Sequence, residues 1–331
     1  MRITKPKYYD AFRCIASECP DSCCKEWDVQ VDETAAAYYR KLPGALGDRL
    51  REVLKEEDGE TVMTIIEGRC PMWRSDGLCR IQAELGHEAL CKTCRDFPRL
   101  IHDYGDFQEL GLELSCPEAA QMILEQDAPE YVSGECHGNT PAEYDEEAME
   151  VLLRTRDRVR GILAERRRPV EEVLALVLMY GYQAQSELDG APEADFDADA
   201  ALDEAEQFAA EGDIPAMLDF FSQLEILTPE WSAMLESPSP AKWDSCHLTL
   251  ARYFVDRYWL QAVSDYDLVS RLKLTIISCL MIRTLGGDLR RTAQLYSKEI
   301  ENDIDNVEAI LDGAYDCPAF TDDKLLGMLL K

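Results

Sequence analysis

The chain has 331 residues, of which 46% are hydrophobic, and this is enough to bury one large core or two smaller ones. Its formal net charge of -31 excludes the broad basic patch with which nucleic-acid-binding proteins contact phosphate groups, so we expect no nucleic-acid partner. The first ten residues lack the apolar core of a signal peptide, and no apolar run reaches the roughly 20 residues of a membrane span, so we expect a cytoplasmic protein with no membrane partner.

The amino-terminal half is predicted to contain short strands and helices between cysteine-rich loops. Residues 27–33 alternate apolar and polar side chains as a brief strand does, and residues 34–42 have a helical pattern that Pro43 and Gly44 end. Further strands are expected at residues 62–67 and 107–114.

A helix is predicted at residues 117–124. Ser115 is the expected N-cap, and Glu118 follows three residues later, which is the spacing of a capping box.

After the turn-rich residues 134–141 the pattern becomes almost entirely helical. The fold class that follows is mainly α, with an α+β, cysteine-rich metal-binding amino-terminal half (residues 1–140) and an all-α carboxy-terminal bundle (residues 141–331). The expected helices of this bundle are 144–168, 170–185, 199–211, 214–224, 243–262, 266–285 and 289–311.

Charge is distributed unevenly along this helical half. Residues 169–241 contain no lysine or arginine, which indicates either a solvated face or a negative field that attracts a lysine-bearing protein. Residues 154–168 instead carry seven arginines. They favour a solvated helix whose arginines pair with acidic side chains over a binding site for an anionic cofactor.

Thirteen cysteines are too many to be incidental in the cytoplasm, where disulfides are rare, so metal binding is the better explanation. Four of them, Cys136, Cys246, Cys279 and Cys317, are scattered and are interpreted as small apolar residues. The nine candidate ligands, a subset of four per site, are Cys14, Cys19, Cys23, Cys24, Cys70, Cys79, Cys91, Cys94 and Cys116.

Spacings of two to four residues allow two sulfurs from one loop to reach one metal, as in zinc and iron–sulfur modules. An iron–sulfur cluster of the 4Fe-4S type is favoured and zinc is the alternative, because both accept four thiolates. Nine thiols are more than the four ligands that one metal site needs, so either there are two sites or some of the cysteines are not ligands. Since adjacent residues of an extended chain point apart, one of Cys23 and Cys24 is expected to face away from the metal.

Other catalytic motifs are missing from the sequence. Cys19 and Cys23 have the first spacing of a radical S-adenosylmethionine motif, but Glu26 stands where the third cysteine should be. The chain also lacks a glycine-rich dinucleotide turn, a P-loop, a His-Glu-x-x-His pair and a Gly-x-Ser-x-Gly elbow.

Three segments resemble the flagellin lysine N-methylase family of bacteria. They are YYDAFRCIASECPDSCCKEWDVQVDE, CPMWRSDGLCRIQAELGHEALCKTCRDFPR and ELGLELSCPEAAQMIL, and a weaker likeness continues at LARYFVDRYWLQAVSDYDLVSRLKL. The double cysteine and Cys-Arg-Asp-Phe-Pro are also similar to small zinc- or iron-chelating modules. The resemblance implies a protein-lysine N-methyltransferase that carries an iron–sulfur cluster and transfers a methyl group from S-adenosylmethionine to flagellin.

Such chemistry needs a base and a desolvating channel, because a lysine amine with its usual pKa of about 10.4 must lose a proton before it attacks. The candidate bases are Asp28, Asp32 and Asp96. The aromatic side chains expected beside the cysteine loops are Tyr8, Tyr9, Phe12, Trp27 and Trp73.

Two other functions remain open at this stage. A noncatalytic zinc- or iron-binding adaptor would use a closed metal site as a staple and bind a basic protein partner through its acidic helical face. An iron–sulfur electron carrier is the third possibility, although no redox partner is indicated by the sequence.

Overall fold

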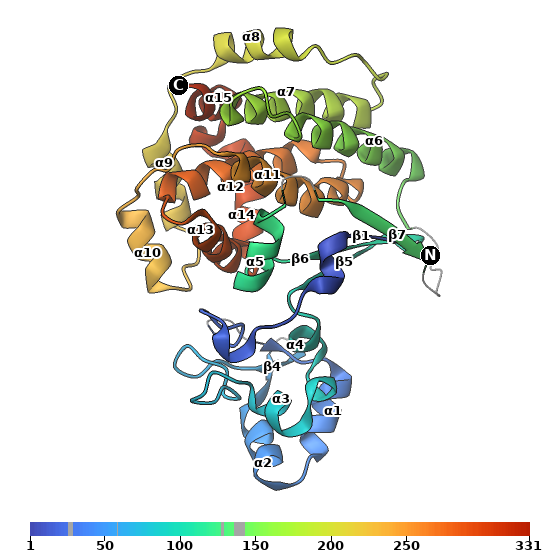
Figure 1. Cartoon of the computed structure of the whole chain (residues 1–331), viewed down its shortest axis with the longest axis vertical. Helices are drawn as coiled ribbons and strands as arrows, with labels where there is room; N and C mark the ends of the chain where they lie inside the picture. Colours follow the sequence, from blue (N-terminus) through green and yellow to red (C-terminus); the bar gives the residue numbers. More distant parts are fainter. Residues whose placement is uncertain (26–28, 58, 127–128, 136–142) are drawn as a thin grey trace.

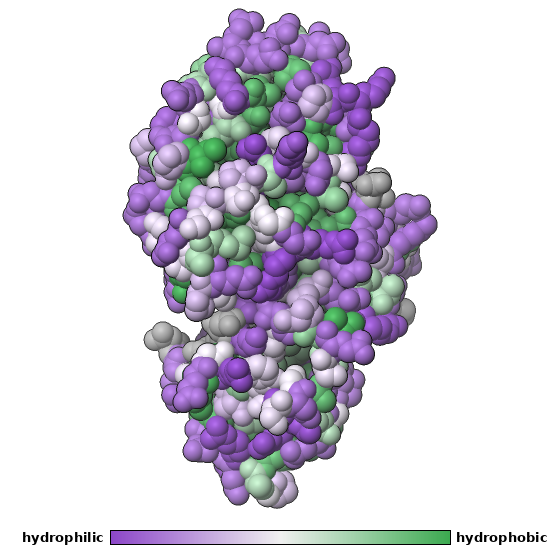
Figure 2. Space-filling view, turned by 60° about the vertical axis from the view of Figure 1, so that its left-hand side comes forward, coloured by the Kyte–Doolittle hydropathy of each residue, from purple (hydrophilic) through white to green (hydrophobic). Residues whose placement is uncertain are grey.

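The structure is a computed structural model of the whole chain, and it describes all residues except 26–28, 58, 127–128 and 136–142. The chain forms a small lobe and a larger, mainly helical lobe, and both termini lie in the larger one (Figure 1). The surface narrows between the lobes and is mostly hydrophilic (Figure 2). The prediction of a mainly α fold is confirmed. Within the described ranges, every helix is either too short or too polar to cross a lipid bilayer.

The described part of the small lobe consists of four short α-helices, a 3-10 helical turn and a three-stranded sheet. Asp32 accepts a hydrogen bond from the Ala35 N–H and begins α1 (Glu33–Lys41), which ends before Pro43 as predicted. The other elements are α2 (Gly44–Val53), α3 (Arg80–Leu85), η3 (His87–Ala89), α4 (Lys92–Asp96) and the antiparallel strands β2 (Val29–Gln30), β3 (Leu54–Glu57) and β4 (Glu60–Met63) in the order β2-β4-β3.

A four-stranded sheet borders the large lobe. The order is β5-β6-β1-β7, in which β1 pairs parallel with β6 and antiparallel with β7. The strands and the short helical turns that follow β1 are β1 (Arg2–Pro6), η1 (Lys7–Ala11), η2 (Ala16–Glu18), β5 (Arg99–Asp103), β6 (Phe107–Leu112) and β7 (Tyr131–Glu135). The amino terminus is thus part of this sheet, whereas the small lobe is inserted between β1 and β5.

The large lobe surrounds α12, which is buried along almost its whole length. The helices predicted at 144–168, 170–185, 199–211, 214–224, 243–262 and 266–285 are confirmed, with ends that differ by a few residues. The elements are α5 (Pro117–Leu124), α6 (Glu146–Leu163), α7 (Val170–Leu188), α8 (Ala198–Phe208), α9 (Ile214–Ser222), α10 (Pro229–Glu236), α11 (Ser245–Tyr258), η4 (Trp259–Val263), α12 (Leu268–Leu285), α13 (Leu289–Tyr296), η5 (Ser297–Glu301), α14 (Ile304–Asp316), η6 (Pro318–Phe320) and α15 (Asp322–Leu330).

Two details of the predicted elements are wrong. Ser115 does not cap α5, because Cys116 is the N-cap residue and the Ser115 hydroxyl donates to Glu113 instead. The helix predicted at 289–311 is broken into α13 and α14 by the π-helical turn η5, and α14 starts afresh where Asp303 accepts N–H hydrogen bonds. The prediction assigned the polar residues of this turn to one continuous helix.

The arginines of α6 are paired with acids as predicted, but they are not all solvated. Arg156 is only 2% exposed and makes two hydrogen bonds of 2.6 Å to Glu109 on β6. Arg160 pairs with Asp256 on α11, with 2.8 Å between Nε and Oδ1. The helix therefore presents these charges to the sheet and to α11, where burial makes pairing necessary.

The packing separates two hydrophobic cores. One belongs to the small lobe and includes Tyr39, Leu50, Cys70 and Cys91. The other joins the helices to η1, β6 and α5. The domain boundary expected between residues 140 and 141 falls outside the described residues, so that division stays a prediction.

Two helical glycines offer a matched test of core packing. A Cβ atom on Gly181 of α7 would lie 2.1 Å from a methyl carbon of Leu272 on α12, whereas a Cβ on Gly161 of α6 meets no atom within 4 Å. We expect Gly181→Ala to lower the free energy of unfolding by about 1–3 kcal/mol. Gly161→Ala should raise it by about 0.5–1 kcal/mol, because alanine is the better helix former. Urea unfolding of both variants measures the difference, and equal stabilities would show that α12 yields to the added methyl group.

Candidate functional site

Most of the predicted cysteine ligands surround one cavity between the two lobes. The cavity has a volume of about 440 Å³. Cys70 and Cys91 are not among its lining residues and are buried in the core of the small lobe. The seven cysteines that line it are Cys14, Cys19, Cys23, Cys24, Cys79, Cys94 and Cys116.

These thiols come from four separate parts of the chain. Cys14, Cys19, Cys23 and Cys24 lie in the loops that follow η1, Cys79 precedes α3, Cys94 is in α4, and Cys116 is the N-cap of α5. Cys23 and Cys24 both line the cavity. They occupy a turn rather than extended chain, and their thiols are hydrogen-bonded to each other. Which of the two would face a metal, or whether one would serve a second metal, stays a prediction.

The thiols interact strongly enough to change one another's proton affinity. The hydrogen bond to Cys24, together with burial, raises the pKa of Cys23. Cys94 donates a hydrogen bond to Cys91, which lowers the pKa of Cys91 and raises that of Cys94. Burial raises the pKa of Cys116 to about 12. Most of these groups are therefore neutral thiols in the free protein, and a bound cation would have to displace their protons.

The donor set has the chemistry of a site for iron–sulfur or zinc, because soft thiols predominate and the cavity lies where loops of both lobes meet. Among the described residues, no three His, Cys, Asp or Glu side chains stand close enough together to hold an ion in this arrangement. The metal site itself stays a prediction, since binding would have to draw the thiols inward.

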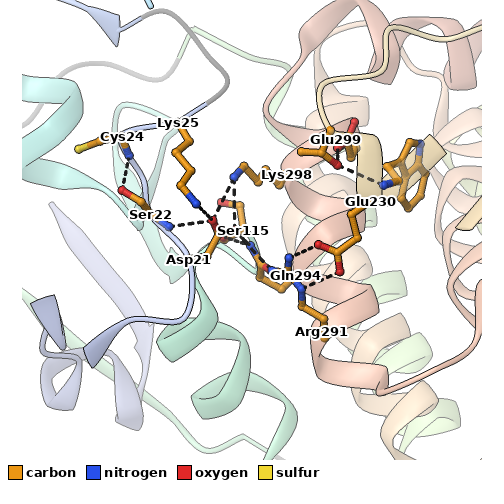
Figure 3. Close-up of polar contacts among 12 residues, drawn as sticks. Asp21, Ser22, Cys24, Lys25, Ser115, Glu230, Arg291, Gln294, Lys298 and Glu299 are labelled. Atoms are coloured by element: carbon orange, nitrogen blue, oxygen red, sulfur yellow. Dashed lines mark hydrogen bonds and ion pairs between the residues drawn. The ribbon is translucent and has the colours of Figure 1, made fainter. Parts of the chain in front are cut away.

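A buried carboxylate attaches the cysteine loop to the large lobe (Figure 3). The Asp21 side chain is 9% exposed and lies 3.3 Å from the Nζ atom of Lys298, which is itself 2% exposed. Gln294 and Arg291 on α13 also contact Asp21 Oδ2, at 3.2 and 3.4 Å. Lys25 lies 3.6 Å away on the other side. Burial alone would raise the pKa of Asp21, but Lys298 and the hydrogen bonds hold it below its ordinary value.

The π-helical turn η5 supplies the large-lobe half of this attachment. Its extra residue per turn changes the direction of the side chains, and three charged ones become buried. Lys298 reaches Asp21, Glu299 accepts hydrogen bonds from Thr228 and the Leu227 N–H, and Glu301 faces α11. The turn η5 therefore contacts the cysteine loop through Lys298 and the residues before α10 through Glu299. Its Glu301 lines a second cavity.

A second cavity of about 560 Å³ lies on the other side of Cys23 and Cys94. We call it the interlobe cleft; Asp96 and Phe97 line it from the small-lobe side, and Glu113 and Glu301 line it from the other. Burial raises the pKa of Glu113, Arg257 opposes this rise and Glu301 adds to it. A carboxylate with a raised pKa beside a cleft is suited to accept a proton.

Glu301 is held more firmly than Glu113. Its two oxygens accept hydrogen bonds from Tyr253 and Tyr258 at 3.0 and 2.9 Å, and Arg257 Nε lies 3.2 Å away. Glu113 accepts one hydrogen bond from Ser115 at 3.2 Å and lies 4.0 Å from Arg257. Glu301 is therefore held in place by three partners, whereas Glu113 has fewer contacts and a raised pKa.

Of the three bases predicted from the sequence, one lines the interlobe cleft and another caps a helix. Asp96 lines the interlobe cleft. Asp32 caps α1 and binds the Lys92 N–H, and these backbone hydrogen bonds lower its pKa, which weakens it as a base. Asp28 lies outside the described residues. All three roles stay predictions.

The predicted aromatic side chains do not line one channel. Phe12 lines the cysteine cavity, whereas Tyr8 lines a different cavity beneath α11. Tyr9 is buried, and the indole of Trp73 stacks against Arg69 at 4.1 Å. Trp27 is not among the described residues.

Sequence reasoning missed Asp21, Glu113, Arg257, Lys298 and Glu301. Asp21 lies between Cys19 and Cys23, so the cysteine spacing could have identified its segment as part of the site. Glu113 follows β6, three residues before Cys116, whereas Lys298 lies 277 positions from Asp21. Their charges look like those of surface residues in the sequence, and only burial distinguishes them.

Comparison with known proteins agrees with the resemblance of the cysteine segments. Over 129 residues the chain is 35% identical to the flagellar biosynthetic protein FliU of Salmonella muenchen, and the match covers 37% of this chain and 76% of FliU. Over the same length it is 34% identical to the lysine-N-methylases of Salmonella typhimurium and Salmonella choleraesuis. The chain belongs to the flagellin lysine N-methylase family.

The extent of this family likeness is limited. The match covers 32% of each lysine-N-methylase and 37% of this chain. No protein-family model matches the chain. No solved structure matches it either. Membership in the flagellin lysine N-methylase family therefore rests on about a third of the sequence.

The buried pair between Asp21 and Lys298 can be tested by a double-mutant cycle. Asp21→Asn should lower the free energy of unfolding by about 3 kcal/mol, because it removes the carboxylate that compensates a buried ammonium group. The double variant Asp21→Asn, Lys298→Met should lose less than Asp21→Asn alone, because both charges are then absent. Asp48→Asn, at an exposed pair with Arg51, is the control and should change stability by less than about 1 kcal/mol. Additive losses in the cycle would show that the pair is not coupled.

Proposed function

We propose that this protein is an S-adenosylmethionine-dependent protein-lysine N-methyltransferase that acts on flagellin and carries an iron–sulfur cluster. Family membership supports the reaction class, since two relatives are named lysine-N-methylases. The observation that carries the proposal to this structure is the interlobe cleft, where Glu113 and Glu301 face Cys23 and Cys94. The noncatalytic adaptor considered above would have no use for a base beside a cleft.

Acidic side chains outnumber basic ones in the lining of the cleft. Asp96, Glu113 and Glu301 offer negative charge to an ammonium group, against the positive charges of Lys92 and Arg99. Phe97 provides an apolar contact for the methylene chain. The net charge of -31 also favours approach of a lysine-bearing surface over that of an acidic one. The segment without basic residues, 169–241, adds to this field.

Glu113 is the group that we assign as the base. In the reaction the ε-ammonium group gives up a proton to Glu113, the lone pair of the resulting amine forms the new N–C bond, and the bond between the methyl carbon and the sulfonium sulfur of the donor breaks. The proton then leaves Glu113 for water. A raised pKa of Glu113 narrows the pKa difference between the carboxyl group and the ammonium group, and so makes the proton transfer less unfavourable. Glu301 lines the same cleft and would attract the ammonium group before the transfer.

The cysteines would hold the cluster, and the four ligands would come from those that line the cavity. A bound cluster would tie the loops of both lobes together and so fix the shape of the interlobe cleft. The Asp21 attachment already places the loop of Cys19, Cys23 and Cys24 against α13 and η5, so that little further ordering of this loop is needed.

Metal content tests the cluster. Protein purified without oxygen should contain about four iron and four sulfide per chain and absorb broadly near about 400 nm. Cys23→Ser should reduce the iron content, whereas Cys317→Ser should leave it unchanged, because Cys317 is the C-cap of α14 and does not line the cavity. A colourless protein with about one or two zinc atoms would contradict the cluster and support a structural staple.

Substitution of the base tests the catalytic assignment. Glu113→Gln should lower kcat for methyl transfer to flagellin by about 100-fold, because the amide cannot take the proton. Glu125→Gln is the control, since Glu125 is an exposed residue at the end of α5. The assay follows labelled methyl groups in flagellin, with iron content measured in each variant. Full activity of Glu113→Gln would remove Glu113 from the mechanism, and absence of transfer by the unmodified protein would contradict the proposed function.

A further inference from the structure

Four cysteines belong to the small lobe itself. Cys70 and Cys91 are 6% and 2% exposed and are part of its core, and Cys79 and Cys94 pack against this core. The cysteines that line the cysteine cavity without them are Cys14, Cys19, Cys23, Cys24 and Cys116. These five are enough for the four ligands of one cluster, so the small-lobe group is available for another purpose.

Backbone contacts hold the first two cysteines of this group side by side. The Arg80 N–H donates to the Met72 carbonyl at 2.7 Å, and Trp73 forms an isolated antiparallel bridge with Cys79. The loop that follows Cys70 therefore runs along the start of α3, where Cys79 is the N-cap residue.

One buried tyrosine connects the remaining two cysteines with Cys79. Tyr39 is fully buried, and its hydroxyl donates to the Ala89 carbonyl at 2.7 Å, just before α4. Burial raises the pKa of Tyr39, and the nearby Cys91, Cys94 and Cys79 add to this rise. These three thiols therefore lie around the same phenol, although α3 and α4 carry them separately.

The backbone around these sulfurs is arranged for thiolates. The Cys70 sulfur accepts a hydrogen bond from the N–H two residues later, and the Cys79 sulfur accepts from the N–H groups two and three residues later. The Cys91 sulfur accepts from both the N–H and the thiol of Cys94. Hydrogen bonds of this kind favour the thiolate, which is the form that binds a metal.

The packing around these thiols suits one ion and not a cluster. Cys70 and Cys91 line neither the cysteine cavity nor the interlobe cleft, and Met63 Sδ lies 3.5 Å from Cys70 Sγ. A cluster of about four iron and four sulfide needs more room than such a packed core provides. A zinc ion with four thiolates needs no open position, because its tetrahedral coordination is complete.

The small lobe also needs a staple in this region. After β4 its core contains only five buried residues within the described part of the lobe, and they are Cys70, Met72, Ile81, Leu90 and Cys91. The helices here are short, with six residues in α3 and five in α4. Such a small apolar core usually depends on a metal or a cross-link for its stability.

We propose that Cys70, Cys79, Cys91 and Cys94 bind one zinc ion that holds the small lobe together, separately from the cluster. Nowhere in the described part of the chain do three such side chains already stand close enough to hold an ion, so zinc has to draw the four thiols together. Each thiol gives its proton to water as its sulfur binds. The zinc site does not depend on methyl transfer.

Metal analysis of the unmodified full-length protein, purified without oxygen, is the first test. We expect about one zinc per chain, and X-ray absorption at the zinc edge should give about four sulfur neighbours at about 2.3 Å. Iron without zinc would overturn this proposal alone, and so would nitrogen or oxygen ligands on the zinc. Zinc without iron would contradict the cluster of the proposed function and leave the zinc site intact.

Cysteine variants assign the ligands. Cys91→Ser should lose most of its zinc and keep its iron, whereas Cys19→Ser should lose iron and keep zinc. Cys279→Ser is the matched control, because Cys279 is a fully buried thiol of α12, and it should keep both metals.

Thermal unfolding shows whether each variant folds. If Cys91→Ser does not, Cys79→Ser takes its place, and the X-ray absorption of the unmodified protein still decides the number of sulfur ligands. Full zinc content in the folded small-lobe variant would overturn the proposal, and so would loss of iron with retention of zinc.

Discussion

The contact between Asp21 and Lys298 is the constraint on which the arrangement of the two lobes depends. The cysteine loop contains few apolar residues, so it cannot be held against the helices by hydrophobic burial alone. A carboxylate and an ammonium group that are both almost fully buried must meet with good geometry, because either one alone would be costly in that environment. Gln294 and Arg291 complete the hydrogen bonds of the carboxylate. The position of four cysteines relative to α13 follows from this contact.

The turn η5 explains how one short segment can serve several sites. In a regular α-helix, residues 298 and 301 would lie on the same face, because residues three positions apart are neighbours. The wider π turn lets Lys298, Glu299 and Glu301 all find buried partners in different directions. The interlobe cleft and the Asp21 attachment are therefore coupled through consecutive residues. A shift in this turn would move Glu301 and the cysteine loop together.

Buried charge is the second feature that organises the large lobe. Arg156, Arg160 and Arg257 lie between the sheet and the helices, and each has an acidic partner. These pairs orient β6, α6 and α11 in one register, because a displaced arginine would leave a charge unpaired. They also set the electrostatics of the interlobe cleft, where Arg257 opposes the rise in the pKa of Glu113 and Glu301 adds to it.

The sequence by itself determined most of the helical bundle, the positions of β2, β4 and β6, and the family, because apolar periodicity, Pro43 and the cysteine spacing are local signals that tertiary contacts did not overrule. It also identified the cysteines that meet at one cavity, since their grouping is visible along the chain. Only the tertiary structure decided that Cys116 joins them from the large lobe, that η5 interrupts the last helices, and that Glu113 and Glu301 share a cleft. The physical reason is that burial and pairing over distances of 100 residues or more change what a charged side chain does, and a charge in a sequence looks the same whether it is solvated or enclosed.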